Sequence, residues 1–433
     1  MQLKRANFGQ LQLIELSPGH REYVAQGPFR QVSDLAEFRL IRLDDCPAVF
    51  AAGFPRPDTA RASWQTDWRL VGGRGLTEAD AIDGCLGELC ERACLVSRGG
   101  DDPLVTDAEA THPANAFLKF SARQQAALVD RHPALRAALK IGDIDWSRMS
   151  RRSVHAECLA DSRIGAVSSI CILLKEERFF GVESEQLGSS AGAAAHPDRE
   201  AAVLNALFEL AEHDAVGIWW YNQLPARRVP LEALAVASPS TSDLAAWVAQ
   251  RDRQTLLLRL PTDLPVYVTA AISADRDGGW TAYGFSAHLS AESSTTGAVL
   301  EMLQCEISLS AMARRVEAMP PDAQDIPALL EWSHRLTLDA VARIDKDEKT
   351  RDPDCEQAVA KQSFLDAVTD HDVWIANVER PEFGVPAVRA VSGSLRDRSP
   401  RFAPGRLYTL PKELGFLDIT PLEHHLNSDI LLV

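Results

Sequence analysis

The sequence predicts a mixed α/β fold, in which mixed sheets pack with helices around a cleft, and three observations support this class. Apolar, β-branched runs typical of strands occur at residues 164–174 and 255–288. Stretches with helical periodicity occur at 77–95, 199–222 and 293–312. Strand and helix patterns alternate along the chain, and this alternation is typical of a mixed α/β core.

Size and charge exclude several classes of function. A chain of 433 residues with 46% hydrophobic residues can bury one large core or two ordinary ones. The formal net charge of −16 argues against a nucleic-acid or anionic-membrane surface. The start lacks the apolar segment of a signal peptide, and no run approaches the length of a membrane span. We therefore expect a soluble, cytoplasmic protein without nucleic-acid or membrane partners.

The first part of the chain, residues 1–64, mixes short apolar runs with prolines and is expected to be a β-rich or irregular lead-in. After it, a strand and a glycine turn lead to a helix for which Thr77 is the expected N-cap, with Asp80 three residues later. The eight cysteines of the chain form no Cys-x-x-Cys pair, so we expect reduced core residues.

That first helix carries Glu88 and Glu91, one turn apart and roughly opposite its apolar face. Gly84 and Gly87 share their side of the helix. Because glycine destabilises a helix by up to about 1 kcal/mol relative to alanine, two glycines beside a Glu pair indicate a close approach by another group. A Glu pair at this spacing is ordinarily solvated, but the glycines favour a metal site.

A second Glu pair lies on the helix expected within 199–222. Asn205, Glu209 and Glu212 share one narrow face, and apolar residues occupy most of the remaining circumference. A helix this apolar is expected to be buried. Because buried carboxylates are unfavourable without cations, the face is a candidate ion site.

The remaining chain adds expected elements without an obvious catalytic motif. Residues 101–152 have a helical pattern with a proline break, 321–370 a polar helical pattern, and 384–395 contain a strand. No spacing places two histidines on one helix face, so surface or capping roles are expected for His196, His213, His424 and His425. Core packing is expected for Trp219, Trp220 and Tyr221.

Several stretches resemble, in order, the landmarks of the YcaO family, ATP-using enzymes that activate peptide backbone amides. The two that carry most of the resemblance are GGRGLTEADAIDGCLGELCERA, with its Glu-x-x-Glu-Arg, and SSAGAAAHPDREAAVLNALFELAEHDAVGIWWYN. The others are KFSARQQ, IDWS, GFSAHLS with VLEMLQ, and GVPAVRAVSGSLRDRSPRFAPGRLY. The resemblance covers roughly residue 65 to the end, so it implies a YcaO-like domain over 65–433.

The resemblance implies ATP and Mg²⁺ as cofactors in a nucleotide cleft. It assigns the metal site to the two carboxylate pairs, Glu88 with Glu91 and Glu209 with Glu212. Carboxylate oxygens are the ligands that Mg²⁺ prefers, and two pairs can hold more than one ion against phosphates. The nucleotide-binding residues it implies are Ser190, Gly192, Arg92 and Arg389. The terminal carboxylate of Val433 is implied as a catalytic group, although the chain lacks the proline-rich tail usual in azoline-forming members.

The closest likeness is to members that convert Cys, Ser or Thr of ribosomally made peptides to thiazolines and oxazolines. It implies a precursor peptide substrate, a separate leader-peptide-binding partner protein, a flavin-dependent azoline oxidase and a homodimer. Thioamide or amidine formation by the same amide activation remains an alternative. A third hypothesis is a non-catalytic scaffold subunit. It is suggested by the replacement of polar or charged family residues by Pro197, Ala201 and Gly297, and of a family arginine by His213.

Overall fold

A computed structural model describes residues 11–15, 29, 32, 36–55, 71–131, 151–180, 186–236, 238–319, 326–341 and 357–432. The IDWS motif at 144–147 and Val433 lie outside the described residues. No helix in the described ranges is long and apolar enough to cross a membrane.

The first of three sheets contains four antiparallel strands in chain order: β1 (Leu11–Glu15), β2 (Ala36–Leu43), β3 (Val49–Pro55) and β4 (Val71–Gly75). Strand β4 follows the expected boundary at residue 64, and it pairs with β3 from Val49↔Gly75 to Gly53↔Val71. The lead-in and the following segment therefore share one sheet.

The second sheet has the order β11-β10-β9-β8 and holds the three strands expected within 255–288. Its members are β8 (Arg227–Val229), β9 (Gln254–Arg259), β10 (Tyr267–Ala274) and β11 (Ala282–His288). All of its pairs are antiparallel. Neighbouring strands in the other two sheets also pair antiparallel, which refines the expected mixed sheets.

The third sheet joins distant parts of the chain in the order β6-β5-β12-β13-β7. The apolar run expected as one strand over 164–174 is shorter: β6 ends at Ser168, and a helical turn, α8 (Ser169–Ile172), follows. The β-branched content of the run did not distinguish the buried turn from a strand. The strands of this third sheet are β5 (Ser153–Cys158), β6 (Ile164–Ser168), β7 (Ala193–Ala195), β12 (Val373–Asn377) and β13 (Ala387–Ser392).

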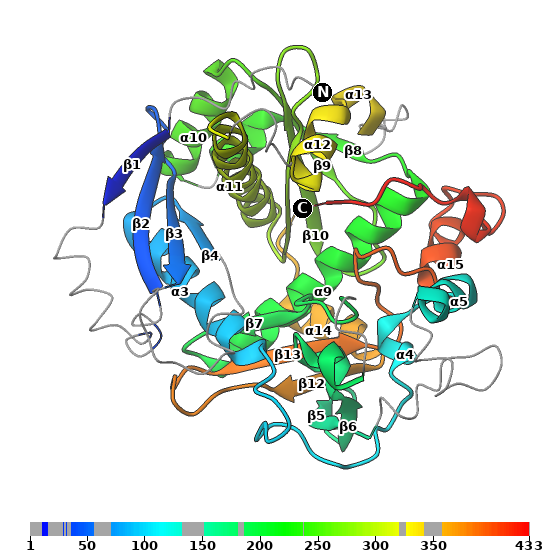
Figure 1. Cartoon of the computed structure of the whole chain (residues 1–433). Coiled ribbons are helices and arrows are strands. Elements are labelled where there is room, and N and C mark those ends of the chain that lie inside the picture. The colour runs from blue at the N-terminus through cyan, green and yellow to red at the C-terminus, as the bar shows by residue number, and fades with distance from the viewer. Residues whose placement is uncertain are drawn as a thin grey trace.

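Three long helices connect these sheets: α3 (Glu78–Leu95), α9 (Arg199–Asn222) and α11 (Ala291–Glu317). Helix α3 packs against β3, β4 and β7, α9 against β11 and β13, and α11 against β4, β10 and β11. Figure 1 shows α9 crossing the middle of the molecule between the sheets. Any group that these helices present on facing sides is thereby brought to one central region.

Local sequence accounts for where the three helices begin. The Thr77 side chain accepts a hydrogen bond from the Asp80 amide at 3.2 Å, which confirms the expected N-cap of α3. Asp198 caps α9 by accepting from the amides of Glu200 and Ala201, and Ser290 caps α11 by accepting from that of Ser293. The ends of the helices are thus specified by residues within one turn of them.

The core also follows the expected pattern. Helix α9 is buried over most of its circumference, and Trp219, Trp220 and Tyr221 are 2, 4 and 1% exposed. Among the described cysteines all are free thiols, and all but Cys305 are buried. The expectation of reduced core cysteines is therefore confirmed for them.

The remaining described helices lie around this frame (Figure 1). They are α4 (Asn115–Leu118), α5 (Ala122–Arg131), α10 (Pro239–Gln250), α12 (Ala328–Arg335), α13 (Leu338–Val341), α14 (Lys361–Thr369) and α15 (Arg406–Glu413), with the 3₁₀ turns η2 (Glu176–Phe180), η3 (Leu231–Val236) and η7 (Glu423–His425).

Candidate active site

Carboxylates from α3, α9 and α11 interact at the centre of the molecule, and we call this group the carboxylate centre. Its members are Glu88, Glu91, Glu209, Glu212 and Glu301. Glu88 raises the pKa of Glu91, Glu91 raises that of Glu209, and both Glu301 and Glu209 raise that of Glu212. The two Glu pairs expected from the sequence therefore meet in space.

The electrostatics of this centre are unfavourable for carboxylates alone. Burial, followed by the neighbouring Glu88, raises the pKa of Glu91 to about 8. Burial and Glu301 raise the pKa of Glu212 to about 8 in the same way. Burial and Glu91 hold the pKa of Glu209 well above its ordinary value. The Glu209 and Glu212 side chains keep 30% and 14% exposure, so they are recessed but still reached by solvent.

Glu88 differs because neighbouring groups already satisfy it. Its Oε2 accepts from the Gly72 amide at 2.8 Å, and its Oε1 accepts from Nε of Arg92 at 3.1 Å. Arg92, expected to bind nucleotide, thus contacts Glu88, the first carboxylate of the Glu pair on its own helix. The glycines beside this pair face the chain's own strands: a Cβ on Gly84 would lie 3.7 Å from Gly73 Cα in β4, and one on Gly87 would lie 3.6 Å from the Ala195 oxygen in β7.

Sequence reasoning missed Glu301, which α11 brings to the centre. Its Oε2 accepts from the Phe285 amide at 3.2 Å and lies 3.3 Å from Nη2 of Arg74. Nη1 of the same arginine donates to Oε1 of Gln304 at 3.1 Å. Glu301 and Gln304 are one turn apart, like the members of each Glu pair, and this repeated spacing is the signal that could have identified them.

The carboxylate centre fits divalent cations that are shared with another ligand. Among the described residues, no three His, Cys, Asp or Glu side chains converge tightly enough to hold a metal ion alone. Carboxylate oxygens with raised pKa values are nevertheless the groups that a hard cation stabilises. Phosphate oxygens and water would therefore have to complete the coordination of any Mg²⁺ held here.

Arg389, on β13, supplies positive charge beside these carboxylates. The residue is 4% exposed, and no described residue accepts a hydrogen bond from its Nε or Nη1. Burial lowers the pKa of Arg389, although Glu209, Asp397 and Glu91 act to raise it. Because buried guanidinium nitrogens without acceptors are unfavourable, the free Nε and Nη1 fit an anionic ligand such as a phosphate group.

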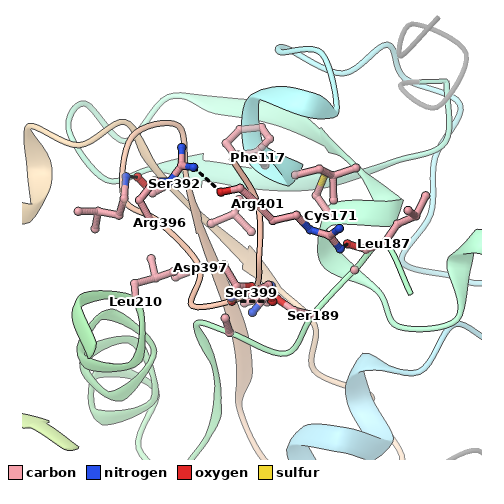
Figure 2. A pocket seen from close by; sticks show the side chains of 17 residues that line it. Phe117, Cys171, Leu187, Ser189, Leu210, Ser392, Arg396, Asp397, Ser399 and Arg401 are labelled. Carbon is pink, nitrogen blue, oxygen red and sulfur yellow. Dashed lines mark hydrogen bonds between the residues drawn. The ribbon is translucent and has the colours of Figure 1, made fainter. Parts of the chain in front are cut away.

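Arg389 also lines a cavity of about 50 Å³, which Figure 2 shows from close by. Asp397, Ser399 and Ser189 lie together at one side of it, and Cys171 and Leu187 lie at another. The cavity thus has both polar and apolar lining side chains.

Ser190 and Gly192 lie in the loop ahead of α9. The Ala193 amide donates to the Ser190 carbonyl at 2.9 Å, closing a tight turn before β7. Gly192 has a φ of 80°, and a Cβ there would lie 2.4 Å from the Ala390 oxygen. A role of the two residues toward phosphate remains a prediction.

Comparison with known proteins identifies the family. The model of the YcaO family, described as a cyclodehydratase that binds ATP and Mg²⁺, matches residues 72–396. The chain belongs to the YcaO family. This description agrees with the cofactors expected from the sequence, ATP and Mg²⁺. No curated protein matches the chain.

Solved structures share the YcaO fold. A heterocyclase in complex with substrate and cofactor has a TM-score of 0.75 at 21% identity, covering 97% of this chain and 59% of its own. YcaO from Methanopyrus kandleri, bound with AMPPCP and Mg²⁺, has a TM-score of 0.58 at 18% identity, covering 90% and 96%. The E. coli microcin synthetase McbBCD complex with pro-MccB17 bound has 0.55 at 13%, covering 81% and 85%. The chain therefore spans about six-tenths of the length of that heterocyclase.

One departure from the YcaO pattern, His213, is placed differently from the expectation. It was expected at the surface, but it is 6% exposed. Its Nδ1 lies 3.2 Å from Oδ1 of Asp397, and its Nε2 lies 3.8 Å from Oε1 of Glu209. Burial lowers the pKa of His213, so the neutral ring is favoured. The expectation was wrong because a polar residue on a nearly all-buried helix needs a partner, and residue 397 supplies it from far along the chain.

Asp397 was also missed by sequence reasoning. Burial raises its pKa, but hydrogen bonds from His213 and Ser189 outweigh burial and hold the pKa well below its usual range. The amide and Oγ of Ser399 also donate to its Oδ1 at 2.9 and 3.0 Å. Asp397 is therefore an ionised, fixed anchor between the cavity and α9.

The other three departures from the YcaO pattern lie at the start of α9 and on α11. Pro197 is exposed just before the N-cap of α9, and Ala201 lies in its first turn. A Cβ on Gly297 would lie 2.4 Å from Oγ of Ser286. Because α11 and β11 approach each other so closely at this point, a large side chain at 297 would require their packing to change.

Proposed function

We propose that this chain uses ATP and Mg²⁺ to activate peptide backbone amides and cyclodehydrates Cys, Ser or Thr of a ribosomally made peptide to thiazoline or oxazoline. The observation that carries the proposal is the carboxylate centre. Carboxylates with raised pKa values face one another across two helices, next to a buried arginine without acceptors. This is an arrangement that cations and phosphates together would stabilise.

Each group has a distinct role in this proposal. Glu91, Glu209 and Glu212, with Glu88 at their edge, hold the metal ions. Arg389 donates to phosphate oxygens with the two nitrogens that now lack acceptors. ATP bound with Mg²⁺ supplies the phosphoryl group that turns the oxygen of the attacked amide into a leaving group. The protein's contribution is therefore positioning and charge neutralisation, which dominate phosphoryl transfer.

The peptide provides its own nucleophile in this reaction. The thiol or hydroxyl of Cys, Ser or Thr attacks the preceding carbonyl carbon, and the oxygen of that carbonyl takes the phosphoryl group. Loss of phosphate leaves the azoline ring, so the peptide loses one water per ring. The apolar and polar parts of the Arg389 cavity support a peptide unit lying beside the phosphates.

Partner proteins are part of the proposal. The microcin synthetase is a complex with pro-MccB17 bound, and the heterocyclase is in complex with a substrate. By analogy, a precursor peptide and a separate leader-binding protein are proposed here, together with a flavin-dependent azoline oxidase and a homodimer. Val433, with its terminal carboxylate, remains a proposed catalytic group.

The direct test measures ATP hydrolysis and peptide mass together, with precursor peptide and partner protein present. Wild type is expected to hydrolyse ATP only with peptide, and the peptide should lose 18 Da, the mass of one water, for each ring. Glu209→Gln and Glu212→Gln should abolish both activities, since each removes a proposed metal ligand. Full turnover by either variant would contradict the metal assignment. A product mass of a thioamide or amidine would move the reaction to that alternative.

A second candidate is a non-catalytic YcaO subunit that binds a peptide or an active relative. The observation favouring it is the loss of polar side chains at Pro197, Ala201 and Gly297, the last explained by close packing on Ser286. Calorimetry with ATP and Mg²⁺ separates the two candidates. No heat of binding with the partner present would support the scaffold, whereas saturable binding would support the enzyme.

A further inference from the structure

His213 is held in a fixed orientation at the edge of the carboxylate centre. The Asp397 carboxylate can only accept, so Nδ1 of His213 donates to its Oδ1 across 3.2 Å. Asp397 is itself held by the Oγ of Ser189 and by the amide and Oγ of Ser399. Asp397 and its serine partners line the cavity in Figure 2. The imidazole therefore has little freedom to rotate.

This orientation leaves two electron-pair donors facing each other. With Nδ1 carrying the ring proton, Nε2 of the neutral imidazole presents a lone pair. It lies 3.8 Å from Oε1 of Glu209, one helical turn earlier on α9. When the Glu209 carboxylate is ionised, neither atom can donate to the other. A cation between them would satisfy both.

The arrangement matches the way proteins prepare histidine as a metal ligand. A carboxylate that accepts from one ring nitrogen fixes the tautomer and raises the basicity of the other nitrogen. Neighbouring ligands on one divalent ion lie about 3 Å apart, since each bond is roughly 2.0–2.2 Å. The separation of 3.8 Å needs only a small side-chain adjustment to reach that value.

We propose that Oε1 of Glu209 and Nε2 of His213 coordinate one divalent metal ion, and that this nitrogen ligand gives the site a preference for Mn²⁺ over Mg²⁺. Mg²⁺ takes oxygen ligands and keeps much of its water. Mn²⁺ also favours oxygen ligands, but as a first-row transition metal it accepts a nitrogen ligand more readily than Mg²⁺ does. Because no third His, Cys, Asp or Glu of the described residues joins this pair, nucleotide phosphate and water supply the other ligands. The inference rests on the proposed nucleotide function.

The test uses the full chain with Mn²⁺ and AMPPCP, and it detects the bound nitrogen directly. Pulsed electron paramagnetic resonance of the wild-type complex is expected to show nitrogen coupling to Mn²⁺. Replacing all histidine nitrogen by ¹⁵N should change the coupling frequencies, which requires no variant. His213→Gln should remove the coupling, whereas His155→Gln, at an exposed position on β5, should retain it. A proton or a hydrogen bond between Glu209 and His213, in place of the metal, would give no coupling.

Affinities supply a second readout. We expect His213→Gln to weaken Mn²⁺ binding about tenfold or more, with a much smaller change for Mg²⁺. Asp397→Asn should weaken Mn²⁺ binding by about 10–100-fold, because it removes the negative charge that fixes the ring tautomer and raises the basicity of Nε2. Bound Mn²⁺ without nitrogen coupling in the wild type would overturn this inference and leave the proposed function intact. Failure of Mn²⁺ and AMPPCP to bind at all would overturn both.

Discussion

Helix α3 contributes to two groups of buried charge that behave in opposite ways. At its C-terminal end, the carbonyls of Cys94 and Val96 accept from Arg380, which also makes a two-pronged ion pair with Asp102 at 2.6 and 2.9 Å. In its middle, Glu88 and Glu91 join the carboxylate centre. Both side chains of the Arg380–Asp102 pair have 0% exposure, yet every charge is matched there.

The pKa values show how the two groups differ. Burial raises the pKa of Asp102, but hydrogen bonds from Arg380 and from the Arg98 amide outweigh it, so the net shift is downward. At the carboxylate centre the pKa values of Glu91, Glu209 and Glu212 all shift upward. Burial of a carboxylate therefore does not by itself indicate a functional site. A net upward pKa shift, which neighbouring arginines do not offset, does.

The largest effect is expected from breaking the matched pair. Arg380→Met would leave the Asp102 carboxylate buried without its positively charged partner, and it should lower the free energy of unfolding by about 3–5 kcal/mol. Urea unfolding followed by tryptophan fluorescence measures this change. A loss below about 1 kcal/mol would show that the pair is not the anchor its geometry indicates.

The next largest effect concerns ligand binding at the carboxylate centre. AMPPCP with Mg²⁺ at 100 times its Kd should stabilise the wild type by about 2.7 kcal/mol, since it binds only the folded state. Glu209→Gln should lose most of this gain. Glu200→Gln is a matched control on the same helix, because Glu200 is 87% exposed and lies 3.7 Å from Lys361. Thermal unfolding with and without ligand measures both, and equal shifts in the two variants would contradict the ion site.

The pH dependence should have opposite signs for the two groups. Folding raises the pKa of Glu91 and Glu212 to about 8, so the folded state binds more protons and their contribution to stability falls as pH rises from about 4.5 to 8. Folding lowers the pKa of Asp102, so its contribution is present above its unfolded pKa and is lost as pH falls through the folded one.

Denaturant unfolding at several pH values, with EDTA present to remove metal, measures these slopes. Glu212→Gln should flatten the decrease between about pH 5 and pH 8. The difference between wild type and Asp102→Asn should shrink toward acid pH, because Asp102 becomes neutral in both states. A Glu212→Gln variant with the wild-type slope would contradict the raised pKa of this carboxylate, which persists although Nη1 of Arg398 lies 3.9 Å from its Oε1.

The smallest effect is expected at the start of the shared helix. Thr77→Ala removes the acceptor for the Asp80 amide and should lower stability by about 1 kcal/mol. Because the cap is distant from the middle of α3, the stabilisation by AMPPCP and Mg²⁺ should stay at its wild-type value. A lost ligand effect in this variant would show that the position of Glu88 and Glu91 depends on the helix end.

Much of the fold could be predicted because its signals are local. Thr77 lies three residues from the amide that it caps, and the strands within 255–288 are read from neighbouring side chains. The error at 164–174 arose where this local signal was ambiguous, since a buried helical turn and a buried strand have the same apolar composition. Ordered motifs over most of the chain also indicated the family, which the match over 72–396 confirmed.

The candidate site was predictable in its parts. Residues at positions i and i+3 share a helix face, so the pairs Glu88 with Glu91 and Glu209 with Glu212 follow from the sequence. Glu301 was missed because nothing near it in the chain relates it to residue 212. Asp397 and the buried state of His213 were missed for the same reason, as their hydrogen bond joins residues 184 positions apart.

The sequence by itself therefore determined the three long helices, the Thr77 cap, the two carboxylate pairs and the family. Only the tertiary structure decided that α3, α9 and α11 present their carboxylates to one centre, that Arg389 lies there without acceptors, and that Asp102 has its own arginine. The physical reason is one of range. Periodicity and capping act within a few residues, whereas the packing of helices on separate sheets determines which distant charges meet and which remain unmatched.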